Sequence, residues 1–283
     1  MLFRQSETRG HAPAKPEPSP SSGTPRAGLE RGDEAKMVVR DLSAGFGGKP
    51  ALKGLNLDIF PRERLAIIGP AASGKTTFLR CLNRLNDLHP DFAHRGQILL
   101  DGRDIYDPEV DVAVLRRRIG MVYAVPTPLP WPVYENVVYG LKLAGMRDGA
   151  RLDERVEAAL KEAFLWDEVK DRLKEPAHNL SGGQQQRLCV ARVLALQPEV
   201  LILDEPCSGL DPISTGKIED ALLELKARHS IVLVTNNTKQ AARASDRTAF
   251  LLMGELVEVG PTPRLFTKPA NQRTNDYLDG QFG

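Results

Sequence analysis

Gly69-Pro70-Ala71-Ala72-Ser73-Gly74-Lys75-Thr76 is the stretch that decides the fold. The apolar run 65–68 leads into it, and a stretch of helical character, 77–82, leads out. A G-x-x-x-x-G-K-T loop between a strand and a helix is typical of a phosphate-binding P-loop. Glycines let backbone N–H groups close around phosphate oxygens, and the following helix points its positive end at the same anion. The pattern predicts that these residues and Thr77 bind a nucleotide, with Lys75 on the β- and γ-phosphates and Thr76 on Mg²⁺.

The composition excludes several classes of protein. The 283 residues include 38 basic and 37 acidic side chains, a net charge of +1, so no general attraction to nucleic acid is expected. The three cysteines, Cys81, Cys189 and Cys207, lie far apart and are expected to be reduced thiols. No apolar run reaches the ~20 residues that span a bilayer, and the N-terminus lacks the apolar core of a secretory signal. A membrane connection is therefore expected to come through a partner.

Residues 1–36 form a separate block rich in proline, serine, glycine and charged residues. Such a segment buries too little apolar surface to offset its ordering entropy, so we predict a disordered tail. An organelle presequence is the alternative, but the acidic residues of the block argue against it. The folded part is predicted to begin at Met37 and to run to residue 283.

Strands alternate with helices along the folded part, which predicts an α/β core of three layers. Two alternating stretches near its start predict a small antiparallel β subdomain, and the proline-rich, strand-free stretch of about 126–180 predicts a helical insertion subdomain. Strands are expected at 38–42, 55–59, 65–68, 97–100, 119–123, 200–205 and 231–235, with a hairpin over 250–258 that turns at Gly254-Glu255. Helices are expected at 77–82, 112–118, 134–144, 152–164, 167–173, 215–228 and 239–244, with a further helix starting at the Ser/Gly-rich stretch 180–187.

Two adjacent carboxylates, Asp204 and Glu205, end an apolar strand that is predicted to lie in the centre of the sheet. Neighbouring strand residues point to opposite faces, so the two side chains are expected to serve different places. We predict that Asp204 serves Mg²⁺, directly or through water, and that Glu205 polarises the attacking water as the catalytic residue. The alternative, a pair of solvated strand-end acids, fits poorly with the apolar residues before them.

Phe46 is the one large aromatic residue of the glycine-rich turn before the P-loop. It is either an ordinary packed side chain or a platform on which adenine stacks, an interaction of about 1–3 kcal/mol in comparable cases. Spacing alone leaves both alternatives open.

Three stretches together resemble the nucleotide-binding subunit of ABC transporters: 69–76, the LSGGQ run 180–184, and 203–206. The LSGGQ run is the specific element, because other P-loop proteins lack it. Four further stretches, 115–122, 165–173, 241–250 and 273–277, are similar to the ATP-binding subunit of bacterial phosphate importers. The resemblance covers residues 37–283.

This resemblance implies a P-loop NTPase core of ABC type that binds ATP and Mg²⁺ and works as a homodimer. It implies that ATP on one P-loop is capped by the second subunit, and that Asn236 faces the γ-phosphate. It also implies two integral-membrane phosphate permease subunits, a periplasmic phosphate-binding protein, and a peripheral place on the cytoplasmic face of the inner membrane. The proline-rich segment around Trp131 lies where such subunits receive the coupling helix of the permease. The capping residues implied for the second subunit are Ser181, Gly182, Gly183, Gln184 and Asp211.

Two residues depart from the pattern of the resembled family. Ala124 stands where the family carries a glutamine, and Asn236 stands where it carries a histidine. An amide can still donate a hydrogen bond to phosphate, but it does not titrate. We hypothesise that ATP binding is retained and hydrolysis is slow. The alternative function is a low-turnover, ATP-dependent regulatory clamp in phosphate sensing, whereas a soluble ABC protein of translation or DNA repair would usually carry two cassettes or long coiled-coil arms.

Overall fold

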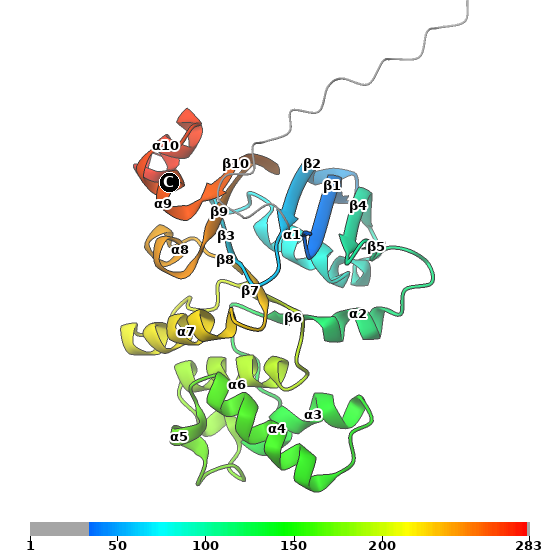
Figure 1. Cartoon of the computed structure of the whole chain (residues 1–283), viewed down its shortest axis with the longest axis vertical. Coiled ribbons are helices and arrows are strands. Elements are labelled where there is room, and N and C mark those ends of the chain that lie inside the picture. Colours follow the sequence, from blue (N-terminus) through cyan, green and yellow to red (C-terminus); the bar gives the residue numbers. More distant parts are fainter. Residues whose placement is uncertain (1–33, 282–283) are drawn as a thin grey trace, which may run out of the picture.

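The computed structural model describes residues 34–281 (Figure 1). Most of the predicted tail, residues 1–33, therefore lies outside the described residues. The first strand begins at Met37, where the sequence predicts that the folded part begins.

The first sheet is antiparallel, with the strand order β2-β1-β4-β5. Its register pairs Met37 of β1 with Ile59 of β2 and with Leu100 of β4. Val39 pairs with Ile98, and Leu42 packs in the same buried cluster although it lies three positions after Val39, because an irregularity between them shifts the alternation of β1. The strands are β1 (Met37–Phe46), β2 (Lys49–Ile59), β4 (Phe92–Leu100) and β5 (Arg103–Asp104).

The second sheet has six strands in the order β10-β9-β3-β8-β7-β6. All neighbouring pairs are parallel except β9 and β10, which form an antiparallel hairpin. The carboxyl ends of β3, β7 and β8 consequently meet at one edge of the sheet, where ligands of open α/β sheets bind. The strands are β3 (Arg64–Ile68), β6 (Ile119–Val122), β7 (Val200–Asp204), β8 (Ser230–Val234), β9 (Arg247–Leu252) and β10 (Glu255–Pro261).

The helices follow the predicted alternation with strands. Helix α1 starts at the P-loop lysine, and α6 and α7 start with side-chain caps. The α-helices are α1 (Lys75–Leu82), α2 (Val112–Arg118), α3 (Val133–Leu143), α4 (Gly149–Glu162), α5 (Trp166–Val169), α6 (Gly182–Leu194), α7 (Pro212–Leu225), α8 (Thr238–Ala244), α9 (Thr262–Thr267) and α10 (Gln272–Leu278), with 3₁₀ turns η1 (Leu85–Leu88) and η2 (Ala177–Asn179).

The six-stranded sheet is buried on both faces, which gives the three predicted layers. In β7, Val200 and Ile202 pack in the cluster that contains Phe78 of α1 and the antiparallel sheet. The residues between and after them, Leu201 and Leu203, pack with α6 and α7 on the other face. The P-loop helix α1 is thus held between two sheets, which fixes the direction of its N-terminus.

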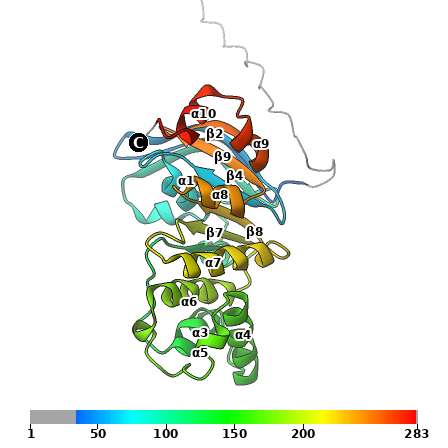
Figure 2. The same cartoon turned by 90° about the vertical axis from the view of Figure 1, so that its left-hand side faces the viewer.

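Helices α3, α4 and α5 form a separate bundle on α6, at the end of the molecule opposite β1 and β2 (Figures 1 and 2). They lie within the predicted insertion 126–180, in which the only strand-like pairing is an isolated bridge between Pro132 and Pro176. Trp131 is 40% exposed and packs on Tyr139 of α3, with ring centroids 5.1 Å apart.

Several element boundaries differ from the prediction. Strand β7 ends at Asp204, and Glu205 adopts φ +47° in the following turn, so strand alternation does not set its direction. The β9–β10 hairpin turns at Met253-Gly254, one residue before the predicted Gly254-Glu255. Helix α7 begins at Pro212 because Asp211 caps it, and α5 is shorter than predicted. Helices α9 and α10 and the short strand β5 were not predicted, because each is too short to show a clear period.

The hairpin turn supports the P-loop through Gly254. Its amide donates to the Ser73 carbonyl at 3.1 Å, and its carbonyl accepts from the Lys53 amide at 2.9 Å. Gly254 has φ +84°, and a Cβ there would lie 2.6 Å from the Ala51 carbonyl oxygen. Only glycine fits this contact between the hairpin, the antiparallel sheet and the P-loop.

We predict that Gly254→Ala lowers the free energy of unfolding by roughly 2–4 kcal/mol, because left-handed strain and a backbone clash add. Gly102→Ala is the matched control, since Gly102 has φ +80° but nothing within 4 Å of an added Cβ. The control should therefore lose only about 1–2 kcal/mol. Urea unfolding of the two variants measures the difference, and equal losses would show that the hairpin contact is unimportant.

Candidate active site

The P-loop backbone has a conformation that requires glycine at two positions. Gly69 has φ +151°, and a Cβ there would lie 2.1 Å from the Leu251 carbonyl oxygen. Gly74 has φ +97°, and its Cβ would lie 2.6 Å from the Ala51 carbonyl oxygen. Ala72 also adopts a positive φ of 60°. The loop is thus pressed against β9 and β2 and curls back over the start of α1, as a phosphate cradle does.

Lys75 is buried at the mouth of this loop, with an exposed fraction of 6%. Its ammonium donates to the carbonyl oxygens of Gly69 and Pro70, both at 2.8 Å. Burial lowers the pKa of Lys75, while the nearby carboxylates Glu205 and Asp204 act in the opposite direction. An ammonium has three protons, so one donor remains for an anion in the loop.

Thr76 and Asp204 meet beside Lys75. The Thr76 hydroxyl donates to Asp204 Oδ1 at 3.2 Å. Burial raises the pKa of Asp204, although Thr76, Arg80 and Lys75 each oppose this shift. A hydroxyl oxygen and a desolvated carboxylate are the hard donors that Mg²⁺ takes alongside water and phosphate oxygens. The pair therefore fits the predicted metal site, with the remaining positions left to water and nucleotide.

Glu205 and Asn236 are joined directly, which sequence spacing did not reveal. The Asn236 amide donates a short hydrogen bond to Glu205 Oε1. The backbone fixes both residues, because the Glu205 amide donates to the Val234 carbonyl at 2.9 Å. The Thr235 amide in turn donates to the Ile67 carbonyl at 3.2 Å, so backbone hydrogen bonds connect the ends of β3, β7 and β8. The predicted catalytic carboxylate thus lies next to the predicted γ-phosphate ligand.

Phe46 lines an open cavity of about 370 Å³ beside the start of α1. Its ring lies 5.4 Å from that of His89, edge to face at 81°, and 5.4 Å from that of Phe92. Phe46 is half-buried, and Thr77 of the predicted phosphate loop lines the same cavity. The ring therefore packs on its neighbours and also borders open space, so both alternatives remain open. The cavity is lined by Phe46, Thr76, Thr77, Arg80, Asn86, His89 and Asp91.

The LSGGQ run forms the capped start of α6. The Ser181 hydroxyl accepts from the Gln184 amide at 3.3 Å, and the Gln184 side chain accepts from the Ser181 amide at 2.9 Å, which is a capping box. Ser181 and Gly182 are exposed, whereas Gly183 is buried, and a Cβ on it would lie 2.1 Å from Ser214 Oγ. The helix start is therefore rigid and open to a partner on its exposed side.

Asp211 is the N-cap residue of α7. Its carboxylate accepts from the Ile213 and Ser214 amides at 3.0 and 2.9 Å and from the Ser214 hydroxyl at 2.6 Å. These hydrogen bonds from Ser214 lower the pKa of Asp211. Asp211 is exposed, so its free face can still meet a partner.

The N-termini of α1 and α6, the two helices expected to contact phosphate, lie in different halves of the molecule. Helix α1 is held between the two sheets, and α6 lies with the helical bundle (Figure 1). Within residues 34–281, no hydrogen bond joins 181–184 to the P-loop residues 69–77. The LSGGQ run does not complete the site of its own chain.

The sequence patterns do not predict the contacts of two further residues, Gln186 and Glu168. Gln186, fully buried, donates from Nε2 to the Tyr123 carbonyl at 2.8 Å and so anchors the chain just before Ala124. Glu168 accepts hydrogen bonds from Arg187 and Gln184 of α6. Gln186 lies four residues into the polar start of α6 and Glu168 lies on the short helix α5, and spacing alone does not name their partners.

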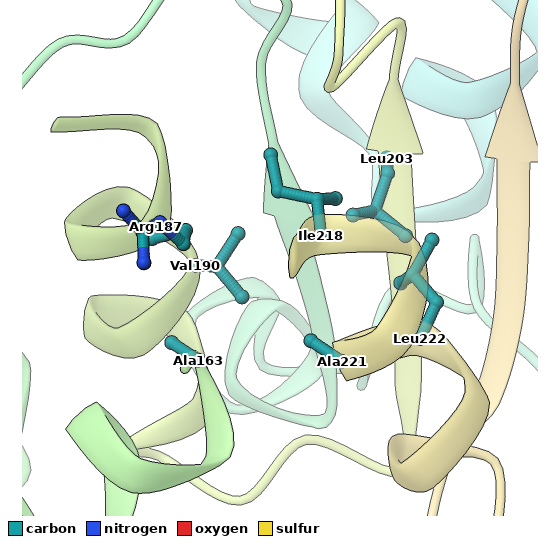
Figure 3. Close-up of a pocket in the computed structure, with 7 residues that line it drawn as sticks. All are labelled: Ala163, Arg187, Val190, Leu203, Ile218, Ala221 and Leu222. Atoms are coloured by element: carbon teal, nitrogen blue, oxygen red, sulfur yellow. The ribbon is translucent and has the colours of Figure 1, made fainter. Parts of the chain in front are cut away.

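A separate apolar gap lies between α6, α7 and β7 (Figure 3). It leaves no room for a water molecule, and aliphatic side chains such as Val190, Leu203 and Leu222 line it. The Arg187 nitrogens point away from these side chains. The gap is a packing feature of the core and not a second ligand site.

The part of the chain that the structure describes contains no helix with both the length and the hydrophobicity to cross a bilayer.

Comparison with known proteins places the chain among transport ATPases. The family model described as "ABC transporter" matches residues 52–208. A phosphate import ATP-binding protein PstB 2 of Lactiplantibacillus plantarum is 53% identical over 247 residues, which cover 87% of this chain and 98% of that protein. A phosphate import ATP-binding protein PstB 1 of Streptococcus pyogenes is 52% identical over 250 residues, with coverage of 88% and 99%.

Solved structures agree with the fold. The chain superposes on cbiO1 of Clostridium perfringens, part of the ABC transporter complex cbiONQ, with a TM-score of 0.73, 28% identity, and coverage of 87% of this chain and 97% of that one. A dimeric, post-hydrolysis structure of the ATP-binding cassette MJ0796 bound to ADP and Pi gives a TM-score of 0.69 at 28% identity, with coverage of 80% and 98%. The P-loop, the strand-end carboxylates, the LSGGQ helix start and these matches lead to one conclusion: the chain belongs to the ABC transporter family and, within it, to the phosphate import ATP-binding proteins.

Proposed function

We propose that this protein is the ATP-binding and ATP-hydrolysing subunit of an importer for inorganic phosphate. The observation that carries the proposal is the meeting of Lys75, Asp204, Glu205 and Asn236 at the carboxyl ends of three neighbouring strands. The phosphate specificity rests on the names of the similar proteins, because the transported ion would pass through the permease and not through this chain.

Each residue of the site has a role in this proposal. The loop 69–77 holds the phosphates, with Lys75 supplying the charge, and Phe46 stacks on the base. Thr76 and Asp204 would hold Mg²⁺, which neutralises charge on the phosphates when bound. Glu205 accepts a proton from the attacking water, and Asn236 orients the Glu205 carboxylate through its amide and can donate to the γ-phosphate.

The proposal includes a head-to-tail homodimer. Ser181 and Gly182 are exposed at the start of a capped helix, which suits a second anion contact across an interface. The same surface includes Asp211 and Gln184. Gly183 lies beneath this surface, because it is buried against Ser214. Nucleotide binding would close the dimer, and hydrolysis would reopen it and drive the permease by a shift in populations.

The remaining partners are two integral-membrane permease subunits, with a periplasmic phosphate-binding protein in the full complex. The protein would then lie peripherally on the cytoplasmic face of the inner membrane. Trp131 and Tyr139 pack on each other and are each 40% exposed, and this exposed aromatic pair supports a permease contact. The import proteins among the relatives favour this function over the regulatory clamp.

Affinity purification of the full chain from membranes tests the proposed function. We expect two integral-membrane subunits and ATP-stimulated phosphate uptake after reconstitution, and we expect Lys75→Ala to recover the same subunits without uptake. Recovery with ribosomes or nucleic acid, in place of membrane subunits, would overturn the proposal.

Glu205→Gln tests the role of the strand-end carboxylate. Loss of a general base should lower ATP turnover roughly 10²–10⁴-fold. ATP affinity, measured by calorimetry, should change less than about twofold, because the phosphate cradle remains intact. Glu224→Gln, an exposed acid on α7, is the matched control and should leave both quantities unchanged. A Glu205 variant with full turnover would remove this residue from the mechanism.

Ala124→Gln combined with Asn236→His tests the hypothesis of slow hydrolysis. Ala124 follows β6, which pairs in parallel with β7, and Asn236 contacts Glu205, so both changes lie at the carboxyl edge of the sheet that carries Asp204. We expect single-turnover hydrolysis to accelerate at least roughly tenfold in the double variant. An unchanged rate would show that Glu205 needs neither group and that the two natural residues are neutral.

A further inference from the structure

Glu168, on α5, is the meeting point of three elements that otherwise share few polar contacts. Its Oε1 accepts from Arg187 Nη1 at 2.7 Å and from Lys217 Nζ at 2.5 Å. Its Oε2 accepts from Arg187 Nη2 at 3.0 Å and from Gln184 Nε2 at 2.9 Å. One carboxylate thus joins α5 to the start of α6 and to α7.

The contact with Gln184 fixes the direction of the capping box. The amide oxygen of Gln184 accepts from the Ser181 backbone, and its nitrogen donates to Glu168. The oxygen and the nitrogen of the Gln184 side-chain amide are therefore both hydrogen-bonded within the chain. The charged acceptor Glu168 fixes which of the two atoms faces it. The Ser181 hydroxyl oxygen accepts from the backbone N–H of Gln184, so the hydroxyl proton of Ser181 remains available to a partner.

The contact with Lys217 brings α7 into the same unit. Helix α7 begins immediately after Asp211, and its Ser214 fills the space above Gly183 of α6. The start of α7 consequently contacts the start of α6 through the Ser214 side chain, which lies against Gly183, while Glu168 bonds to both helices further along. Arg187 is 4% exposed and also donates to the Phe164 carbonyl at 2.5 Å, so the guanidinium side of the pair is buried, whereas Glu168 is 27% exposed.

The electrostatics of this cluster agree with a permanent pair. Hydrogen bonds from Arg187, Lys217 and Gln184 lower the pKa of Glu168 to about 2, against the effect of its partial burial. These hydrogen bonds therefore favour the charged form of Glu168. Hydrogen bonds to charged groups contribute more to stability than exposed ion pairs do.

We infer that Glu168 is a positioning residue that holds the LSGGQ helix start and the Asp211 loop as one preformed surface for the second subunit. This inference rests on the proposed homodimer. Since a preformed surface loses less conformational freedom on association, Glu168 should strengthen ATP-driven dimerisation. It should not affect ATP binding to the P-loop, because the cluster lies in the helical half of the molecule, away from α1.

The experiment uses Glu205→Gln as the parent, so that ATP is retained and not hydrolysed. Sedimentation with ATP and Mg²⁺ gives the dimer dissociation constant, and a fluorescent ATP analogue at low protein concentration gives the monomer affinity. Adding Glu168→Gln should raise the dimer dissociation constant roughly tenfold, the equivalent of about 1.4 kcal/mol, while the monomer affinity changes less than about twofold.

Two further variants separate positioning from simple loss of fold. Lys217→Met removes only the α7 arm of the cluster, and because Lys217 is 39% exposed its loss should leave folding intact and still weaken the dimer. Glu157→Gln, which removes an exposed pair with Lys161 on α4, should change nothing. If Glu168→Gln and Lys217→Met dimerise as tightly as the parent, or lose ATP affinity to the same extent as dimerisation, the inference is wrong. A parent that stays monomeric with ATP would instead contradict the proposed dimer itself.

Discussion

Backbone hydrogen bonds between the ends of β3, β8 and β7 are the constraint on which the site depends. The Thr235 amide reaches the Ile67 carbonyl and the Glu205 amide reaches the Val234 carbonyl, so three loops leave the sheet at one level. Strand β8 pairs in parallel with β3 on one side and with β7 on the other. The loops that follow the three strands therefore emerge at the same edge of the sheet. Lys75, Asp204, Glu205 and Asn236 are brought together by this edge although 161 positions separate the first from the last (236 − 75).

Burial gives these groups their chemistry. Lys75 and Asp204 are both largely removed from water, and burial disfavours the charged form of each, lowering the pKa of Lys75 and raising that of Asp204. A polyphosphate with its cation would supply opposite charges to both, so nucleotide binding offsets the desolvation cost of Lys75 and Asp204. The LSGGQ helix start, by contrast, is satisfied internally by its capping box and by Glu168. In the proposed dimer, the P-loop of one subunit would bind the nucleotide, and the preformed LSGGQ helix start of the other would contact it.

Much of this could be predicted from the sequence, because the decisive residues lie in contiguous motifs. The P-loop, the buried strand before Asp204 and the LSGGQ run each have a local pattern, and the structure has the predicted strand–loop–helix order around them. Contacts between distant positions could not be predicted: Asn236 with Glu205, Gln186 with the Tyr123 carbonyl, and Glu168 with Gln184. Glu205 was predicted as a strand residue, yet its positive φ places it in a turn, since strand periodicity says nothing about where a strand stops. Whether Ala124 and Asn236 slow hydrolysis remains a prediction.

The central claim is that each catalytic site is built from two copies of the chain. A mixing experiment tests it most directly: Lys75→Ala protein and Ser181→Arg protein are each assayed for ATP hydrolysis alone and then as a mixture. In a head-to-tail dimer, the mixed pair contains one site with an intact P-loop and an intact capping serine from different chains. We predict that the separate variants are inactive and that the mixture regains turnover. A mixture as inactive as its components, with both proteins folded and able to associate, would contradict a shared site.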